Sequence, residues 1–246
     1  MKPWHEYRVA RHKVTNSSFY AKRTNPIAKF LNISVIYENE NTLELIIKDH
    51  NRSSFEIPLK EPFPHKSLLN FDSQNFSKNV LNYHVDIQDD PFSVKITRKV
   101  TNEVIFDMKE ENLLLSKQYL EFGSSIPTLD IFGMGERNFQ FRLIPGIYTV
   151  WARDEVGDIE TGQQPGHNSY GVHPMYLNKE KSGNYFISFL RSSNPFDFTI
   201  TNQSTINYKI AGGIIHLKFF LGDLYPETSI KRYHEYIEGF GMPPFW

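Results

Sequence analysis

The sequence predicts an all-β fold, an antiparallel β-sandwich with a single C-terminal helix. Six segments alternate apolar with polar residues, the period of a strand that buries one face. Turn-forming residues separate these segments, and the chain contains 20 Phe, 13 Tyr and 3 Trp, side chains that suit pleated surfaces. Many short strands with so little helix favour an antiparallel sandwich over alternating α/β units.

The six alternating segments are expected as strands in chain order. Their apolar residues lie two apart and therefore share one face of each strand. These positions are Leu31, Ile33, Val35 and Tyr37; Leu43, Leu45 and Ile47; Phe92, Val94 and Ile96; Phe196, Phe198 and Ile200; Ile206, Tyr208 and Ile210; and Ile215, Leu217 and Phe219. The stretch 58–82 contains three prolines and little alternation, so it is expected as a long excursion between strands.

One helix is expected from Pro226 to about Glu238. Pro226 suits the first helical position, and Glu227 suits the positive N-terminal end of the helix dipole. Apolar residues then recur at helical spacing, and Gly239 supplies a stop.

The composition argues against several classes of function. With 27 basic and 28 acidic side chains, the protein has no overall field that would attract nucleic acid. No run of about 18 apolar residues occurs, so no membrane span is expected. The absence of cysteine excludes disulfides, a thiol nucleophile and a zinc–thiolate site. No motif requires a cofactor.

The N-terminal residues bear on the compartment. They lack the apolar stretch of a secretory signal, which favours an intracellular location. Residues 1–26 are basic and are expected as a solvated arm, although their composition also faintly resembles an organellar presequence. Five N-x-S/T sequons, of the kind glycosylated in the secretory pathway, leave the compartment open.

The stretch 151–177 has the composition of a ligand site, with acids, amides, two histidines and four glycines. His167 and His173 do not have the spacing of a zinc finger or a metal-binding helix, so no metal is expected. The acids between 154 and 160 either include a pair for acid/base chemistry on a sugar or form a solvated loop. FGMGE, at 132–136, lacks the third glycine and the Lys-Ser/Thr of a phosphate loop.

Trp151, Tyr170, His173 and Tyr176 form the best candidate cluster. Sugars present apolar C–H faces and a rim of hydroxyl groups, which suit flat aromatic walls with a few polar groups. Packing of the same aromatic residues in the sandwich core explains the pattern equally well.

Five segments follow one another along the chain: IFGMGERNFQFRL, YTVWARD, NSYGVHPMYL, YKIAGGIIHLKFFLG and PETSIKRYHEYIEGFGMPPFW. In this order they resemble the amino-terminal domain of glycoside hydrolase family 31, the α-glucosidases and maltases. The resemblance covers residues 27–246. It implies a galactose-mutarotase-like β-sandwich over 27–225, followed by a helix and linker over 226–246 that would lead into a catalytic (β/α)8 barrel.

The resemblance implies a substrate contact at Asp154, which matches the aspartate of the family's W-x-R-D segment. Trp151, Tyr170 and His173 are expected beside it, and the ligand would be an α-linked glucose saccharide. Two residues further on, the family has a threonine that contacts substrate in some members. Val156 stands there in this chain, so that second contact is not expected.

Both catalytic aspartates of the family belong to the barrel, which follows the MPPFW segment. Retaining hydrolysis needs two carboxyl groups about 5 to 5.5 Å apart, and this chain resembles the part that supplies neither. The chain is therefore expected to hold no catalytic residue and to be inactive on its own.

The resemblance also implies an interface. The apolar residues Phe240, Met242, Phe245 and Trp246 would be exposed without the barrel, and such surfaces usually bind a partner. The leading interpretation is a structural or interaction module in a larger assembly with other subunits or a barrel. The alternatives are one half of a split α-glucosidase and a carbohydrate-binding module; a mutarotase activity has only the fold to support it.

Overall fold

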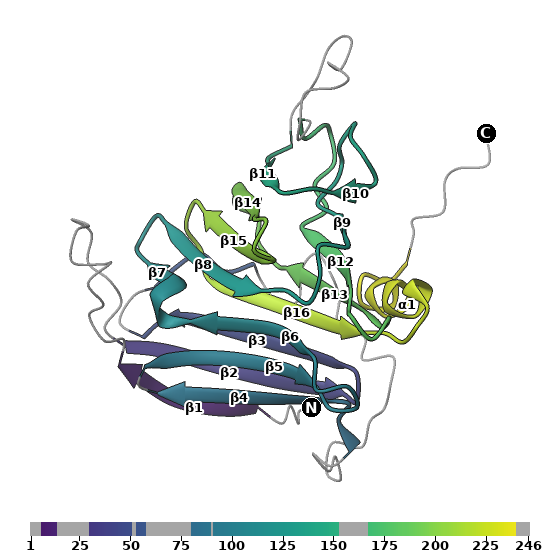
Figure 1. Ribbon diagram of the computed structural model, residues 1–246. Helices are drawn as coiled ribbons and strands as arrows, with labels where there is room; N and C mark the ends of the chain where they lie inside the picture. Colours follow the sequence, from purple (N-terminus) through teal and green to yellow (C-terminus); the bar gives the residue numbers. More distant parts are fainter. Residues whose placement is uncertain are drawn as a thin grey trace.

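The computed structural model describes residues 6–13, 30–50, 53–57, 80–89, 91–152 and 167–239. In these ranges the chain forms antiparallel sheets in two layers and one α-helix, α1 (Figure 1). The predicted all-β sandwich with a C-terminal helix is confirmed. None of the helical segments in these ranges is long and apolar enough to cross a lipid bilayer.

One layer is a sheet with the strand order β1–β2–β3–β16–β13–β12–β9–β10. Its strands are β1 (Glu6–Lys13), β2 (Phe30–Asn39), β3 (Thr42–Asp49), β16 (Ile215–Leu221), β13 (Tyr185–Leu190), β12 (Met175–Lys179), β9 (Ile131–Gly133) and β10 (Arg142–Leu143). The other layer contains two smaller sheets. They comprise β11 (Gly146–Val150), β14 (Phe196–Ile200), β15 (Thr205–Ile210), β8 (Leu120–Ser125) and β7 (Leu113–Leu115), in this order, and β4 (Tyr83–Asp89), β5 (Phe92–Arg98) and β6 (Val104–Lys109), with a 3-10 turn at Glu110–Asn112 before β7.

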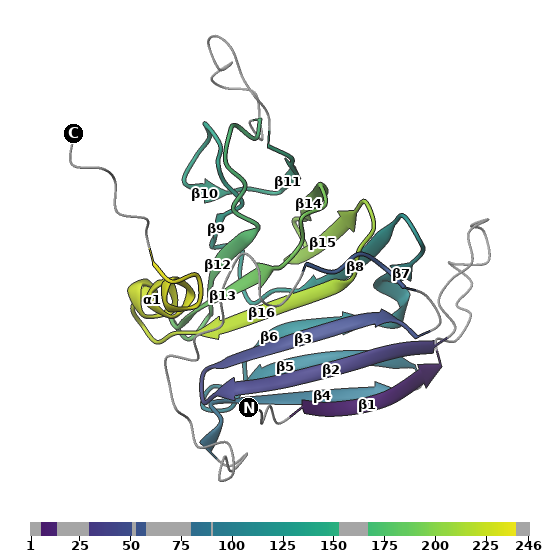
Figure 2. The ribbon, with the colours of Figure 1, turned by 180° about the vertical axis from the view of Figure 1, so that it is seen from behind.

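The two smaller sheets meet where β6 lies against β8. The backbone N–H of Asp107 donates to Ser124 Oγ at 2.8 Å across this seam. Views from opposite sides show β4, β5 and β6 covering one face of β1, β2 and β3 (Figures 1 and 2). Between the layers, the Phe106 and Phe219 rings lie 5.4 Å apart, centroid to centroid, in one continuous core.

The apolar positions predicted from the period of two form this core. All of them except Tyr37 are at most 3% exposed, and Tyr37 stacks on the buried Tyr83. One difference concerns residues 1–26, which were expected as a solvated arm. Within them, β1 pairs with β2 and forms the edge of the large sheet.

The helix α1 (Pro226–Tyr236) begins at the predicted proline and ends two residues before the predicted limit. It covers the outer face of β16, where the Tyr233 and Phe220 rings lie 5.8 Å apart. Gly222 makes this close packing possible, because a Cβ there would lie 2.1 Å from Ser229 Oγ.

A buried ion pair joins the two layers at one end. Arg98, at the end of β5, is 5% exposed and makes hydrogen bonds of 2.6–3.0 Å to the Glu180 carboxylate. The same guanidinium donates to the backbone carbonyls of Gly222, at 2.9 Å, and Tyr185, at 3.1 Å. Arg98 therefore links the small three-stranded sheet to two strands of the opposite layer.

We predict that Arg98→Met lowers the free energy of unfolding by about 3–5 kcal/mol, because Glu180 would keep its buried position without a cation. Urea denaturation measures the change. Lys48→Met is the control, because Lys48 forms an exposed pair with Glu56, 2.9 Å away, and should cost less than about 1 kcal/mol. Equal losses in the two variants would contradict a central role for Arg98.

Candidate functional site

Three of the four predicted ligand-contact residues lie where strands of the two layers end. Trp151 directly follows β11, and Tyr170 and His173 belong to the segment 167–174, which leads into β12. β11, β12 and the short β9 and β10 lie together at one end of the sandwich (Figures 1 and 2). The structure thus brings the flanks of the predicted site to one place.

The rest of the predicted site lies outside the described residues. Asp154 belongs to the undescribed stretch 153–166, and its role as a substrate contact stays a prediction. The predicted interface residues also lie outside the described ranges: Phe240, Met242, Phe245 and Trp246.

Paired strands fix both flanks of the site. β11 pairs with β14 along its whole length, up to the last pair, Val150 with Phe196. Within β11, the Tyr148 hydroxyl donates to the Ile144 carbonyl at 2.6 Å and accepts the Ile144 N–H at 2.9 Å. β12 lies between β9 and β13 in the other layer. Trp151 and the segment 167–174 therefore start from ordered strand ends.

The turn 134–137, which follows β9, holds the segment 167–174 in place. Its backbone bonds to the segment 167–174 run from Glu136 N–H to Gly171 O (3.0 Å), from Ser169 N–H to Glu136 O (2.9 Å) and from His173 N–H to Gly135 O (2.8 Å). Gly133, the last residue of β9 before the turn, has φ +124°, and a Cβ there would lie 2.4 Å from the Met175 carbonyl oxygen. Only glycine fits this position.

Glu136 is the site residue that the sequence analysis missed. Its carboxylate Oε2 accepts the N–H of Gly171 at 2.7 Å. A Cβ on Gly171 would lie 3.1 Å from that oxygen and 3.4 Å from His173 Nε2, so the carboxylate and the imidazole both border Gly171. The FGMGE segment contains Glu136, but the sequence analysis considered it as a phosphate loop and as part of a family motif, and gave this carboxylate no role.

The arrangement offers flat aromatic faces beside polar groups. Trp151 is 62% exposed and Tyr170 is 60% exposed, and Glu136 and His173 are also at the surface. Tyr176 is different: it is fully buried and packs 5.6 Å from Phe198, centroid to centroid, so it belongs to the core. Exposed rings with a carboxylate and an imidazole can bind a polyhydroxylated ligand through stacking and hydrogen bonds.

Metal binding receives no support from the described part of the chain. No group of three histidine, aspartate or glutamate side chains is placed there to hold an ion. His167 and His173 lie in the same segment, without a third ligand among the described residues.

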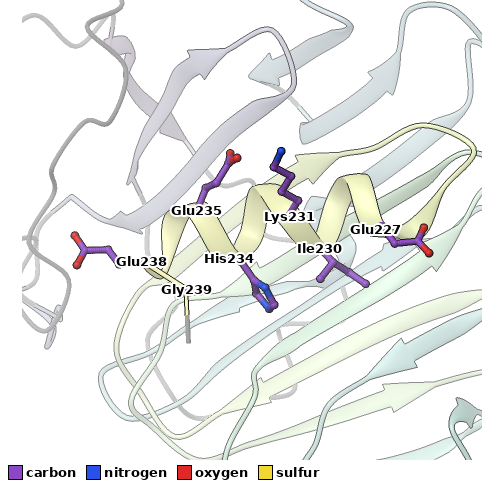
Figure 3. A pocket seen from close by; sticks show the side chains of 7 residues that line it. All are labelled: Glu227, Ile230, Lys231, His234, Glu235, Glu238 and Gly239. Carbon is purple, nitrogen blue, oxygen red and sulfur yellow. The ribbon is translucent and has the colours of Figure 1, made fainter. Parts of the chain in front are cut away.

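Two hollows lie near α1. The larger, of about 620 Å³, follows one side of this helix and is lined by Glu227, Ile230, Lys231, His234, Glu235, Glu238 and Gly239 (Figure 3). All seven residues come from α1 and the turn after it, so no second element converges on the hollow. The smaller, of about 320 Å³, is lined mainly by residues with polar side chains: Glu40, Asn41, Asn82, Arg98, Val100, Asn184, Gly222, Asp223 and Arg232.

Known proteins resemble this chain over most of its length. Lysosomal acid alpha-glucosidase of Tetrahymena pyriformis is 36% identical over 228 residues, which cover 92% of this chain and 24% of that protein. Human intestinal sucrase-isomaltase is 29% identical, over 91% of this chain and 12% of that protein. No protein-family model matches the chain.

A solved structure shares the fold of this chain. A GH31 dextranase of Flavobacterium johnsoniae superposes with a TM-score of 0.65 at 12% identity, over 99% of this chain and 29% of the dextranase. Over most of its length the chain is similar to one part of glycoside hydrolase family 31 enzymes, as an amino-terminal domain of that family would be. The chain spans less than a third of the length of each of these proteins.

A second group of titratable residues lies on the outer face of the large sheet. Lys218 of β16 is 1% exposed; its Nζ donates to Glu44 Oε1 at 2.8 Å and to the Glu38 carboxylate. His216 Nε2 lies 3.3 Å from Glu44 Oε2, and the Tyr236 ring centroid lies 3.8 Å from Lys218 Nζ. Tyr236 of α1 lies over Lys218, so the group is enclosed within the fold and is not an open site.

The pKa values of the two carboxyl groups in this cluster are shifted in opposite directions. Burial raises the pKa of Glu38 to about 7, despite the opposing charge of Lys218. Burial also acts to raise the pKa of Glu44, but the hydrogen bond with His216 and the charge of Lys218 outweigh it and hold this pKa well below its usual range. Between the unfolded and folded pKa of Glu38, the native state retains a proton that the unfolded state has lost.

Stability should therefore fall as the pH rises through this window. We predict that the free energy of unfolding decreases by about 1–3 kcal/mol from Glu38 between about pH 5 and pH 8. Glu38→Gln should flatten this slope, and Glu56→Gln, at an exposed carboxylate, should leave it unchanged. Urea denaturation at several pH values measures both variants; an unaltered slope in Glu38→Gln would refute the assignment.

Proposed function

We propose that this chain is a non-catalytic structural and interaction module of an α-glucosidase-like assembly. In this assembly a barrel domain or another subunit covers the end of the sandwich where the candidate site lies. The observation that carries the proposal is the exposed apolar surface there. Half of the ten large apolar side chains exposed in the described ranges lie between residues 141 and 172: Phe141, Ile147, Trp151, Tyr170 and Val172. Their exposed fractions range from 38% to 84%.

Two physical arguments support this assignment. Exposing large apolar side chains to water is unfavourable, and a group of them at one end of a domain usually marks a contact with a partner. The relatives are also much longer than this chain, so a neighbouring domain in those proteins is available for such a contact. In one half of a split enzyme, that neighbour would supply the catalytic carboxylates.

Saccharide binding is a second candidate, and the exposed Trp151 and Tyr170 favour it. Tyr170 directly precedes Gly171, whose N–H donates to the Glu136 carboxylate, and the Trp151 backbone is bonded to Asn168 of the same segment, so exposed rings and polar groups belong to connected parts of the chain. The dextranase with the same fold was solved with isomaltotriose, an α-linked glucose saccharide. We propose the same class of ligand for this chain, with Asp154 as a further contact.

The interaction proposal predicts a native mass well above the 28.8 kDa of the chain. The protein is purified from its source without denaturation, and light scattering after gel filtration gives the mass. A mass equal to the sum of this chain and a family 31 barrel would support the enzyme-half arrangement. A stable, soluble monomer without a partner would refute the interaction role.

The saccharide proposal predicts heat of binding when maltose or maltotriose is titrated into the chain at millimolar concentration. Trp151→Ala should weaken binding about tenfold, because one aromatic contact contributes on the order of 1.4 kcal/mol. Tyr225→Ala is the matched control, since Tyr225 is 69% exposed but lies next to α1. Absence of heat with the wild-type chain would remove saccharide binding from consideration.

A further inference from the structure

A single buried side chain connects the two flanks of the site. The backbone N–H of Trp151, at the end of β11, donates to Asn168 Oδ1 at 2.9 Å. Asn168 is 1% exposed and lies in the segment that leads to β12. The bond therefore fixes the Trp151 backbone, which leaves one layer of the sandwich, against a segment that belongs to the other layer.

The other end of the same amide holds the Tyr170 side of the site. Asn168 Nδ2 lies 2.8 Å from the Gly171 carbonyl oxygen, 3.2 Å from that of Ser169 and 3.4 Å from that of Glu136. An amide donates through its nitrogen and accepts through its oxygen, so only this orientation satisfies the surrounding groups. Turned by 180°, the amide would place its oxygen against three carbonyls and its nitrogen against an N–H.

Glu136 supplies a second connection to the same segment. Its carboxylate accepts the Gly171 N–H at 2.7 Å, and its own backbone N–H donates to the Gly171 carbonyl at 3.0 Å. Gly171, directly after Tyr170, is thus held through both its N–H and its carbonyl oxygen. A side chain at Gly171 would approach this carboxylate to 3.1 Å, so the position has little room for one.

We propose that Asn168 and Glu136 are positioning residues that set the distance and orientation between Trp151 and Tyr170. Asn168 is too deeply buried to touch a ligand, so it acts through the backbone of its two neighbours. Rings held in place before binding lose little conformational entropy when a sugar stacks on them. The proposal deepens the saccharide-binding function proposed above and rests on it.

The test compares Asn168→Ala with Asn178→Ala in the full chain. Asn178 is a matched control because it is also buried and its Nδ2 donates to the carbonyls of Thr128 and Asp130, away from the Trp151 bond. Amide hydrogen exchange at Trp151, measured in the absence of sugar, reports on the hydrogen bond to Asn168 itself. Calorimetry with maltotriose reports its consequence for binding.

We expect Asn168→Ala to raise Trp151 amide exchange and the Kd for maltotriose about tenfold, the size expected from one lost buried hydrogen bond. Asn178→Ala should leave both within about twofold, even where it lowers the melting temperature. Unchanged Trp151 exchange in a folded Asn168→Ala variant would overturn the proposal. Unchanged affinity would overturn it too, provided that the wild-type chain binds sugar.

A companion variant, Glu136→Ala, covers the case in which Asn168→Ala does not fold. Glu136 is exposed, so its removal should leave the fold intact, raise exchange at the Gly171 amide and weaken maltotriose binding. A folded Glu136→Ala variant with native exchange and affinity would then reject the positioning role. If the wild-type chain binds no maltotriose, the saccharide function fails. The exchange data still decide whether Asn168 and Glu136 hold the backbone at Trp151 and Gly171.

Discussion

The structure depends on the burial of β16 on both of its faces. Its inward side chains, Ile215, Leu217 and Phe219, meet the smaller sheets, and Phe220 on its outer face meets Tyr233 of α1. A central strand that is buried on both faces requires a layer on each side, so the two sheet layers alone would leave its outer face exposed to solvent. The helix is therefore part of the core, and its close approach explains the glycine at the end of the strand.

The outer face of β16 also holds polar and ionisable side chains. Lys218 and His216 alternate with the inward residues, and their partners are Glu44 on β3 and Glu38 near the end of β2. A buried ion group of this kind contributes little net stability, but removing one member leaves an unpaired charge. Its benefit lies in specificity, because the register of β16 against β3 must bring Lys218 opposite Glu44, as the structure has it.

The sequence predicted the parts of the fold that depend on local periodicity. The run Ile215, Leu217, Phe219 showed the inner face of β16, and Pro226 with Gly239 showed the limits of α1. The strand β1 was missed because its basic residues suggested a solvated arm, whereas pairing with β2 satisfies its backbone regardless of side-chain type. Likewise, no periodicity shows that α1 covers Phe220.

The sequence indicated which residue types gather at the candidate site, but not the contacts that hold them in place. The exposed Trp151 and Tyr170 follow from their polar surroundings, and Tyr176 belongs to the core because it falls on the inward face of β12. Glu136 and Asn168 escaped notice because their roles come from contacts between segments about 30 residues apart, which no local pattern records.

Two regions of the domain differ in how they are held together. Arg98 joins the layers through a buried ion pair, and α1 adds an aromatic contact with β16. Around the candidate site, β9 has three residues and β10 has two, and the large sheet ends there beside exposed rings. Short strands bury little apolar area, so this region gains little stabilisation from its own strands. It can remain ordered because backbone bonds and the Asn168 amide fix it, and those polar connections leave the aromatic faces available to a ligand or a neighbouring domain.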